Sequence, residues 1–326
     1  MHLTVVGSGT VVPEGDRVCA CYYLETASAR GAGAAADADS AAGGDGVPAT
    51  ARSADAASGP RVLLDCGPGA LHHMARFRVP WGDLTHVVLS HFHTDHVGGL
   101  PILLFSLKHG LAEKRERPLD VVGPAGTADL FRRMADAFGG YVTDPGFPVR
   151  IHEIGSGAAL ELGAAGEPRA LPESDGSPGA GRTSETGRTS ETGRTPGPGA
   201  LVLRARAVPH TDAALAYRLE TPGAALGYTG DTGPDDALGD FLRGVDLLVA
   251  ECSLPDDLAI PIHLSPASLA RLARRAAPRT LMPTHVYPQL GWERVEAALR
   301  EAGWGGTTVV ARDGLRIAVA RAEATD

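Results

Sequence analysis

Four side chains that bind metal ions in other proteins fall within six residues of this sequence. His91, His93, Asp95 and His96 belong to the segment HFHTDH. The segment directly follows an apolar, β-branched run at residues 85–89 that predicts a buried strand. If the strand geometry continues, His91 and His93 point to one face and can share a metal, while a following turn directs Asp95 and His96 toward a second position beside it. Imidazole and carboxylate ligands suit Zn²⁺, with Mn²⁺ or Fe as alternatives.

Six residues cannot close two metal sites, so this hypothesis requires ligands from distant parts of the chain. Three candidates come just after predicted strands, where a strand end opens onto the rim of a site: His210, Asp231 and His285. His263 lies two residues before Ser265, the predicted N-cap of a helix. The remaining histidines lack such placement, and we expect no metal role for them: His2, His72, His73, His86, His109 and His152.

The elements that must position these ligands alternate along the chain. Strands are predicted at residues 3–6, 21–26, 61–65, 85–89, 119–122, 149–154, 201–208, 214–220, 224–228, 246–250, 280–282, 307–311 and 315–319. Helices are predicted at residues 70–77, 127–138, 266–276 and 292–302. Many strands, several of them in hairpins, between helices favour a sandwich of sheets covered by helices.

Two stretches are too poor in apolar residues to contribute to a core. Residues 28–60 are almost entirely Ala, Gly, Asp and Ser, and residues 163–199 contain a tandem GRTSET repeat. We predict disordered, low-complexity loop insertions in both places. Because the ligands from His91 to His285 straddle the second insertion, residues 1–326 are expected to form a single domain.

Composition excludes several classes of protein. The formal net charge is −9 over 326 residues. The composition therefore gives no sign of the basic face typical of a protein that binds nucleic acid mainly through its phosphates. No apolar run is long enough to cross a membrane, and the first residues lack the features of a secretory signal, so we expect a cytoplasmic location. The four cysteines show no CxxC spacing and are expected to be reduced thiols.

The segment HFHTDH is the HxHxDH signature of the metallo-β-lactamase fold superfamily, and the order of the downstream His210, Asp231 and His285 matches that superfamily's motifs. Other blocks make the chain resemble ribonuclease Z and its phosphodiesterase relatives: TVVGSGT (4–10), DCGPG (65–69), PHT (209–211), YTGDT (228–232), ECS (251–253) and HLS (263–265). The resemblance implies an α/β fold, a four-layer αββα sandwich with two zinc ions at one edge. It also implies a homodimer.

The resemblance also implies a role for each site residue. One metal would be bound by His91, His93 and His210, the other by Asp95, His96 and His285, with Asp231 bridging them. Asp95 would also orient the attacking water, and His263 would stabilise the scissile phosphate or protonate the leaving oxygen. Asp65 would orient ligands through hydrogen bonds.

These roles describe a metal-dependent hydrolase. Two neighbouring metals lower the pKa of a shared water and clamp the attacking and leaving oxygens of an in-line displacement. We therefore expect a dinuclear zinc phosphodiesterase of the ribonuclease Z type, acting on tRNA 3′ ends or on another phosphodiester. Residues 163–199 are acidic on balance and show no clear equivalent of a basic arm that grips tRNA, so the substrate stays open. The alternatives are a hydrolase of an aryl sulfate ester, lactone or thioester and a non-enzymatic metal-binding module, because a fold does not fix its substrate.

Overall fold

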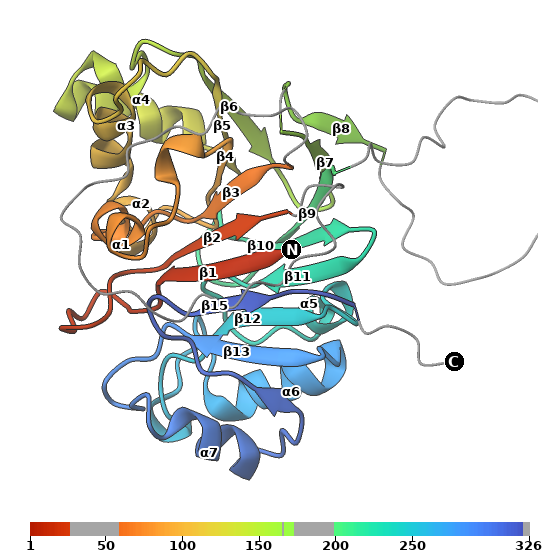
Figure 1. Cartoon of the computed structure of the whole chain (residues 1–326). Helices are drawn as coiled ribbons and strands as arrows, with labels where there is room; N and C mark the ends of the chain where they lie inside the picture. The colour runs from red at the N-terminus through yellow and green to blue at the C-terminus, as the bar shows by residue number, and fades with distance from the viewer. Residues whose placement is uncertain (27–58, 165, 173–198, 322–326) are drawn as a thin grey trace, which may run out of the picture.

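Two stacked β-sheets form the centre of the computed structural model, which describes residues 1–26, 59–164, 166–172 and 199–321 (Figure 1). The first sheet has the strand order β15-β1-β2-β3-β4-β5-β6, and the second has the order β14-β13-β12-β11-β10-β9-β7-β8. The strands of the first sheet are β1 (His2–Gly7), β2 (Cys21–Glu25), β3 (Arg61–Leu64), β4 (His86–Val88), β5 (Leu119–Pro124), β6 (Val149–Ile154) and β15 (Arg316–Ala318). Those of the second are β7 (Ala159–Leu162), β8 (Arg169–Leu171), β9 (Leu201–Ala207), β10 (Leu215–Thr221), β11 (Ala224–Tyr228), β12 (Leu247–Glu251), β13 (Thr280–Thr284) and β14 (Thr307–Thr308).

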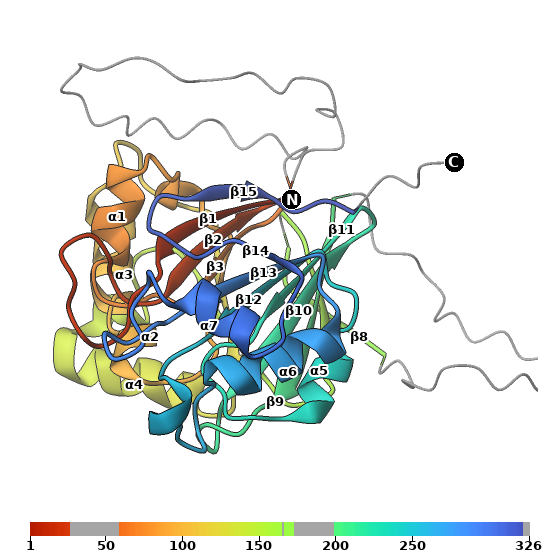
Figure 2. The ribbon, with the colours of Figure 1, turned by 90° about the horizontal axis from the view of Figure 1, so that it is seen from below.

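Helices cover the outer face of each sheet. The principal helices are α1 (Ala70–Arg76), α2 (Thr94–Val97), α3 (Leu100–His109), α4 (Thr127–Phe138), α5 (Asp236–Phe241), α6 (Pro266–Ala276) and α7 (Val295–Glu301). Figure 2 shows α1, α3 and α4 on one side of the molecule and α5, α6 and α7 on the other. The predicted αββα sandwich is therefore confirmed.

Three apolar clusters explain this layering. The central cluster joins the facing sides of both sheets, with Tyr22 and Val88 from the first and Leu203 and Tyr217 from the second. A second cluster packs the outer face of the first sheet against its helices, and a third does the same for the second sheet. Strands in the middle of such a stack are covered on both faces, which is why β11 and β12 are buried along their whole length.

Strand direction determines where the loops meet. Parallel pairs link β3 to β4, β5 and β6 in the first sheet and β11 to β12 and β13 in the second. The carboxyl ends of parallel neighbours lie at the same edge of a sheet, so the loops after them gather there. All the predicted metal ligands follow strands of these two sheets, whereas His263, which was not predicted to be a ligand, precedes α6.

The structure corrects several expectations. Residues 169–171 form the edge strand β8, so the predicted loop at 163–199 was drawn too wide; β8 pairs with β7 through backbone hydrogen bonds, which need no apolar side chains. The strand before the HFHTDH segment ends at Val88 and does not continue through His91 and His93. Helices α2, α3 and α5 were not predicted. The expected disorder of the insertions falls mainly on residues 27–58 and 173–198, which lie outside the described residues.

Candidate metal centre

The site lies at one edge of the sandwich, where the loops after β4, β9, β11 and β13 converge. In Figure 1 this edge is on the left, near α2, which contains the second half of the ligand segment. His93 is the N-cap residue of α2, with an extended backbone, and the helix then turns Asp95 and His96 back toward the sheets. A short helix, rather than a continued strand, thus gives the four ligands of this segment different positions.

One group of candidate ligands combines three imidazoles and a carboxylate. The ligand atoms of His91, His93, His210 and Asp231 all lie within 4.8 Å of one another. His93 Nδ1 and His210 Nε2 are 3.1 Å apart. Asp231 Oδ2 is 3.9 Å from His91 Nε2 and 3.8 Å from His210 Nε2. This set has the donor types and the spacing to hold one metal ion.

A second group lies beside the first. The ligand atoms of Asp95, His96 and His285 are also within 4.8 Å of one another. Asp231 reaches this group too, with Oδ1 3.3 Å from His96 Nε2 and Oδ2 3.6 Å from His285 Nε2. One carboxylate therefore faces both groups, as a bridging ligand must. A third combination, Asp231 with His263 and His285, satisfies the same distance condition.

Two buried nitrogens show that this cluster fits metal ions. The Nε2 atoms of His91 and His96 are buried and have no hydrogen-bond partner. A buried polar atom without a partner is costly and rare in folded proteins, so both atoms call for a ligand. Burial, reinforced by the neighbouring His96, also lowers the pKa of His91 to about 2, which keeps its ring in the neutral form that binds metals.

The opposite ring nitrogens are occupied by partners that fix how each ring points. His91 Nδ1 lies 3.0 Å from Ser90 Oγ, and His285 Nδ1 lies 3.2 Å from Ser253 Oγ. His210 Nδ1 donates to the carbonyl oxygen of Ile262 across 2.9 Å. Hydrogen bonds of this kind select the tautomer that presents Nε2 to a metal.

Asp65 supports the metal centre through hydrogen bonds to residues around the ligands. Its carboxylate is fully buried and accepts hydrogen bonds from Ser90 N at 2.7 Å and from Tyr228 OH at 2.6 Å. It also lies 2.7 Å from His96 Nδ1. The adjacent turn needs a glycine at position 230, because a Cβ there would come within 2.6 Å of Ser90 Cβ and the φ angle is +55°. The packing that places Asp231 is therefore tight.

His263 stands beside the two groups and pairs with Glu251. Its Nδ1 is 2.9 and 3.0 Å from the two carboxylate oxygens of Glu251, which is buried at the end of β12. Burial opposes a charge on the His263 ring, but the hydrogen bond and the negative charge of Glu251 outweigh it and raise the pKa of His263 above its ordinary value. Glu251 belongs to the ECS block at 251–253, but sequence reasoning assigned it no role; its other signal is an acidic residue that ends an apolar run.

The six histidines for which the sequence predicted no metal role belong to none of these ligand groups within the described part of the chain. His73 and His86 are buried, and His73 Nδ1 lies 3.0 Å from Asp313 Oδ2. His72 and His109 are exposed on helices.

In the described ranges, no helix has the length and apolar character to span a membrane.

Comparisons with known proteins agree with this geometry. The profile of the beta-lactamase superfamily domain matches residues 60–286. Ribonuclease BN of Escherichia coli is 32% identical over 265 residues, which are 73% of this chain and 82% of that protein. Ribonuclease Z of Haloarcula marismortui is 29% identical over 279 residues, 79% of this chain and 87% of that protein.

Solved structures show the same fold at lower identity. The metallo-beta-lactamase fold protein YhfI from Bacillus subtilis superposes with a TM-score of 0.67 at 17% identity, covering 97% of this chain and 98% of that one. The short form of human tRNase Z gives a TM-score of 0.62 at 17% identity, covering 98% and 99%. The two-sheet architecture is therefore shared along the whole length of these proteins.

Proposed function

Because this chain belongs to the beta-lactamase superfamily, and within it to the family of ribonuclease Z and ribonuclease BN, we propose that it is a dinuclear metal-dependent phosphodiesterase. The observation that carries the proposal is the pair of ligand groups that share Asp231, with His263 beside them. A single metal would need fewer ligands than the seven that converge here.

The ligand assignment follows the two groups. His91, His93 and His210 would bind one ion, Asp95, His96 and His285 the other, and Asp231 would bridge them. Nitrogen and oxygen donors in this ratio favour two Zn²⁺ ions, with Mn²⁺ or Fe as alternatives. When bound, such ions supply positive charge beside the phosphate oxygens and lower the pKa of a bound water.

The chain's own residues then move and hold protons. Although burial works against it, the nearby His285 ring lowers the pKa of Asp95 to about 2, so Asp95 is a carboxylate that can accept a hydrogen bond from the attacking water and orient it. His263 donates a hydrogen bond from Nδ1 to Glu251. The Nε2–H group of the charged ring is then free to give its proton to the departing oxygen. Glu251 stabilises that charge and fixes the ring.

The substrate is a phosphodiester. The named relatives are ribonucleases, which supports an RNA substrate such as the 3′ end of a tRNA precursor. The same machinery can cleave other phosphodiesters, because the metal groups and His263 act on the phosphate and its leaving oxygen.

Three further properties belong to the proposal. We expect residues 1–326 to fold as one domain, since the ligands come from both sheets. Family resemblance supports a homodimer, which light scattering of the purified chain would test. The cytoplasmic location predicted from the sequence also stays a prediction.

The decisive experiment measures metal content and then turnover. The purified protein should contain close to two equivalents of metal and should hydrolyse bis(p-nitrophenyl) phosphate or a 3′-extended tRNA. An aryl sulfate, a lactone and a thioester serve as comparison substrates. If zinc- and manganese-loaded protein cleaves no phosphodiester, the proposal is wrong.

A further inference from the structure

An exposed apolar segment borders the metal centre. Residues 258–262, with the sequence LAIPI, end directly before His263. Its three large aliphatic residues, Leu258, Ile260 and Ile262, are 51%, 40% and 42% exposed to solvent. A contiguous patch of exposed aliphatic residues often marks a binding site, above all when it lies beside a reactive centre. We call residues 258–262 the apolar rim.

Backbone contacts hold the apolar rim in place beside the ligands. The carbonyl oxygen of Ile262 accepts the hydrogen bond from His210 Nδ1 at 2.9 Å. Gly233 packs so closely under the rim that a Cβ there would lie 1.8 Å from the carbonyl oxygen of Pro261. Two residues before the rim begins, Asp256 Oδ1 accepts a hydrogen bond from Ala267 N at the start of α6. The rim is thus tied to a metal-ligand ring and to two neighbouring elements.

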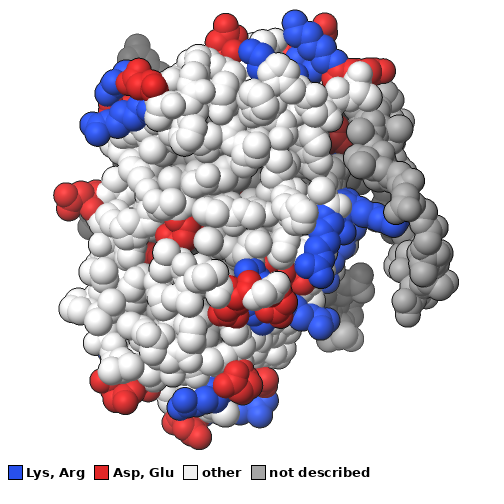
Figure 3. Space-filling view, turned by 90° about the vertical axis from the view of Figure 1, so that its left-hand side faces the viewer, with Lys and Arg blue, Asp and Glu red and all other residues white. Residues whose placement is uncertain are grey.

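The charge around the rim does not suit a polyanion. No Lys or Arg occurs between residues 253 and 264, and apart from His263 the charged residues there are Asp256 and Asp257. Figure 3 looks at the edge that carries the site: Lys and Arg lie near the top and bottom of this face and, mixed with Asp and Glu, right of and below its centre. A protein that grips a nucleic-acid backbone places cations along its path. Charge complementarity at this edge therefore favours a neutral group beside the phosphate.

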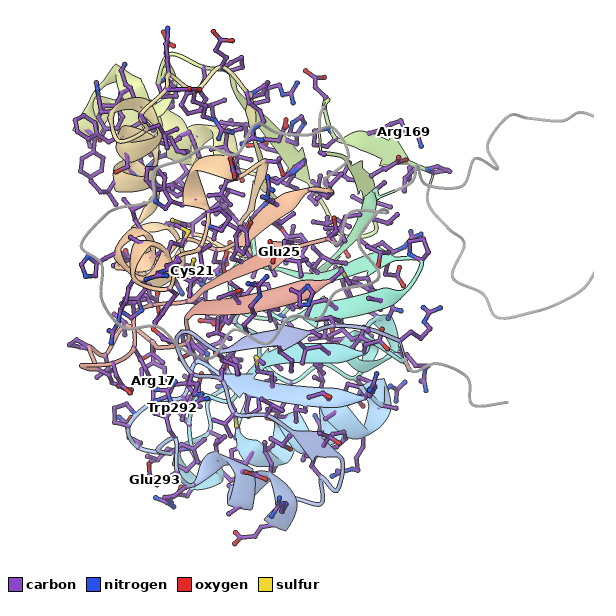
Figure 4. All side chains as sticks on the ribbon, viewed as in Figure 1. Arg17, Cys21, Glu25, Arg169, Trp292 and Glu293 are labelled. Atoms are coloured by element: carbon purple, nitrogen blue, oxygen red, sulfur yellow. The ribbon has the colours of Figure 1, made fainter. Side chains whose placement is uncertain are left out.

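The cation on the loop after β1 is already engaged. The Arg17 guanidinium lies 3.5 Å from the centre of the Trp292 ring, and the two side chains are adjacent in Figure 4. Its NH1 donates to Ser8 Oγ at 2.6 Å and to the carbonyl oxygen of Ala311 at 2.8 Å. Arg17 therefore supports this loop and is not available as a phosphate clamp.

We propose that the apolar rim binds the uncharged, apolar ester group of a small phosphodiester, so that the preferred substrates are aryl or alkyl diesters rather than tRNA. The inference rests on the proposed function, since it names the substrate class of the same centre. Burying part of two isoleucines against such a group should raise kcat/KM about tenfold over a substrate with a methyl group in that place.

The test compares two substrates that share a leaving group. Phenyl p-nitrophenyl phosphate and methyl p-nitrophenyl phosphate both release p-nitrophenolate, so the ratio of their kcat/KM values reports on the retained ester. Wild type should favour the phenyl ester, and Ile260→Ser with Ile262→Ser should reduce the preference about tenfold through a higher KM with little change in kcat. Phe138→Ser, at a position on α4 that is 58% exposed, is the control for removal of an exposed apolar side chain and should keep the wild-type ratio.

A binding measurement separates this inference from the proposed function. Calorimetry with the metal-loaded protein compares methyl(phenyl)phosphinate with dimethylphosphinate, which have only P–C bonds to their organic groups and therefore no ester bond to hydrolyse. Loss of the phenyl preference in the double variant supports the rim even if no diester is hydrolysed, in which case the proposed function alone fails. Equal preference in wild type and double variant overturns the inference, and so does cleavage of a 3′-extended tRNA with a higher kcat/KM than the phenyl ester.

Discussion

The backbone N–H of His285 donates a hydrogen bond to the carbonyl oxygen of Ser8 across 3.0 Å. Ser8 is in turn held by Asp313, whose Oδ1 accepts from Ser8 N at 2.8 Å and from Ser8 Oγ at 2.7 Å. His285 needs this support because its φ angle of +53° lies in the left-handed region that residues other than glycine seldom adopt. A metal-ligand candidate thus depends on residues at both ends of the chain.

We predict that Asp313→Ala weakens metal binding at the group containing His285. Without the carboxylate, Ser8 loses its anchor and the His285 ring is less well placed; outer partners of metal ligands typically contribute about 10- to 100-fold in affinity. Zinc titration against a competing chelator should show one weakened site and one unchanged site. Asp313→Asn, which keeps one acceptor oxygen, should lie between the two proteins. Equal weakening of both sites would show that Asp313 acts only on the fold.

Metal removal should destabilise the folded chain. The Nε2 atoms of His91 and His96 are buried without partners, so the metal-free state carries a cost that bound ions remove. At a free metal concentration of about 100 times Kd, binding contributes about 3 kcal/mol per site. Thermal unfolding of chelated protein should therefore begin several degrees lower and recover when zinc is restored. The same Tm before and after chelation would contradict the proposed centre.

His263→Ala should abolish most turnover while leaving the metal in place. Loss of a general acid typically lowers the rate by about 10²- to 10⁴-fold. Metal analysis of the variant provides the control, since His263 is not assigned as a ligand. Wild-type turnover in a fully loaded variant would remove His263 from the mechanism.

Glu251→Gln should shift the alkaline limb of the pH profile. The proposed reaction needs a protonated His263, so kcat falls as the pH rises through the pKa of that ring. Glu251 raises this pKa by its hydrogen bond and charge, so a neutral amide should lower it and move the limb toward lower pH. Profiles of kcat against pH, measured on proteins of equal metal content, make the comparison. If the fall of kcat at high pH occurs at the same pH in the variant, a group other than His263 is responsible for it.

The ligand set could be predicted because each member leaves a mark in the sequence. His91 to His96 are contiguous, and His210, Asp231 and His285 each follow an apolar run, so their convergence needs only that parallel strands end at one edge. Glu251 also ends an apolar run, but neither its position nor that of Asp313 in the sequence identifies the residue with which it pairs. Their partners are set by loop packing over distances of up to 305 residues along the chain, and a single acidic residue is compatible with many environments.

Helix α3, one of the three helices that were not predicted, shows a different limit of the sequence. In α3, Leu100, Leu103, Leu104 and Leu107 are buried and repeat with helical spacing. The pattern is concealed because Ile102 and Phe105 are also apolar but exposed. A sequence that is apolar on both faces of a helix gives no periodic signal, and only the tertiary structure shows which face packs.

Acid should destabilise the fold through His86, the first residue of β4, which belongs to neither ligand group. Burial, with smaller effects of its neighbours, lowers the pKa of His86 to about 4. Between pH 6.5 and 4 the unfolded chain binds a proton that the folded chain does not, so stability falls as the pH falls through this window. A shift of this size corresponds to about 3 kcal/mol. Urea unfolding of metal-free protein should show a smaller loss between pH 7 and 4.5 in His86→Gln than in wild type. His72→Gln, at an exposed position on α1, should follow wild type, and parallel curves for all three proteins would refute the assignment.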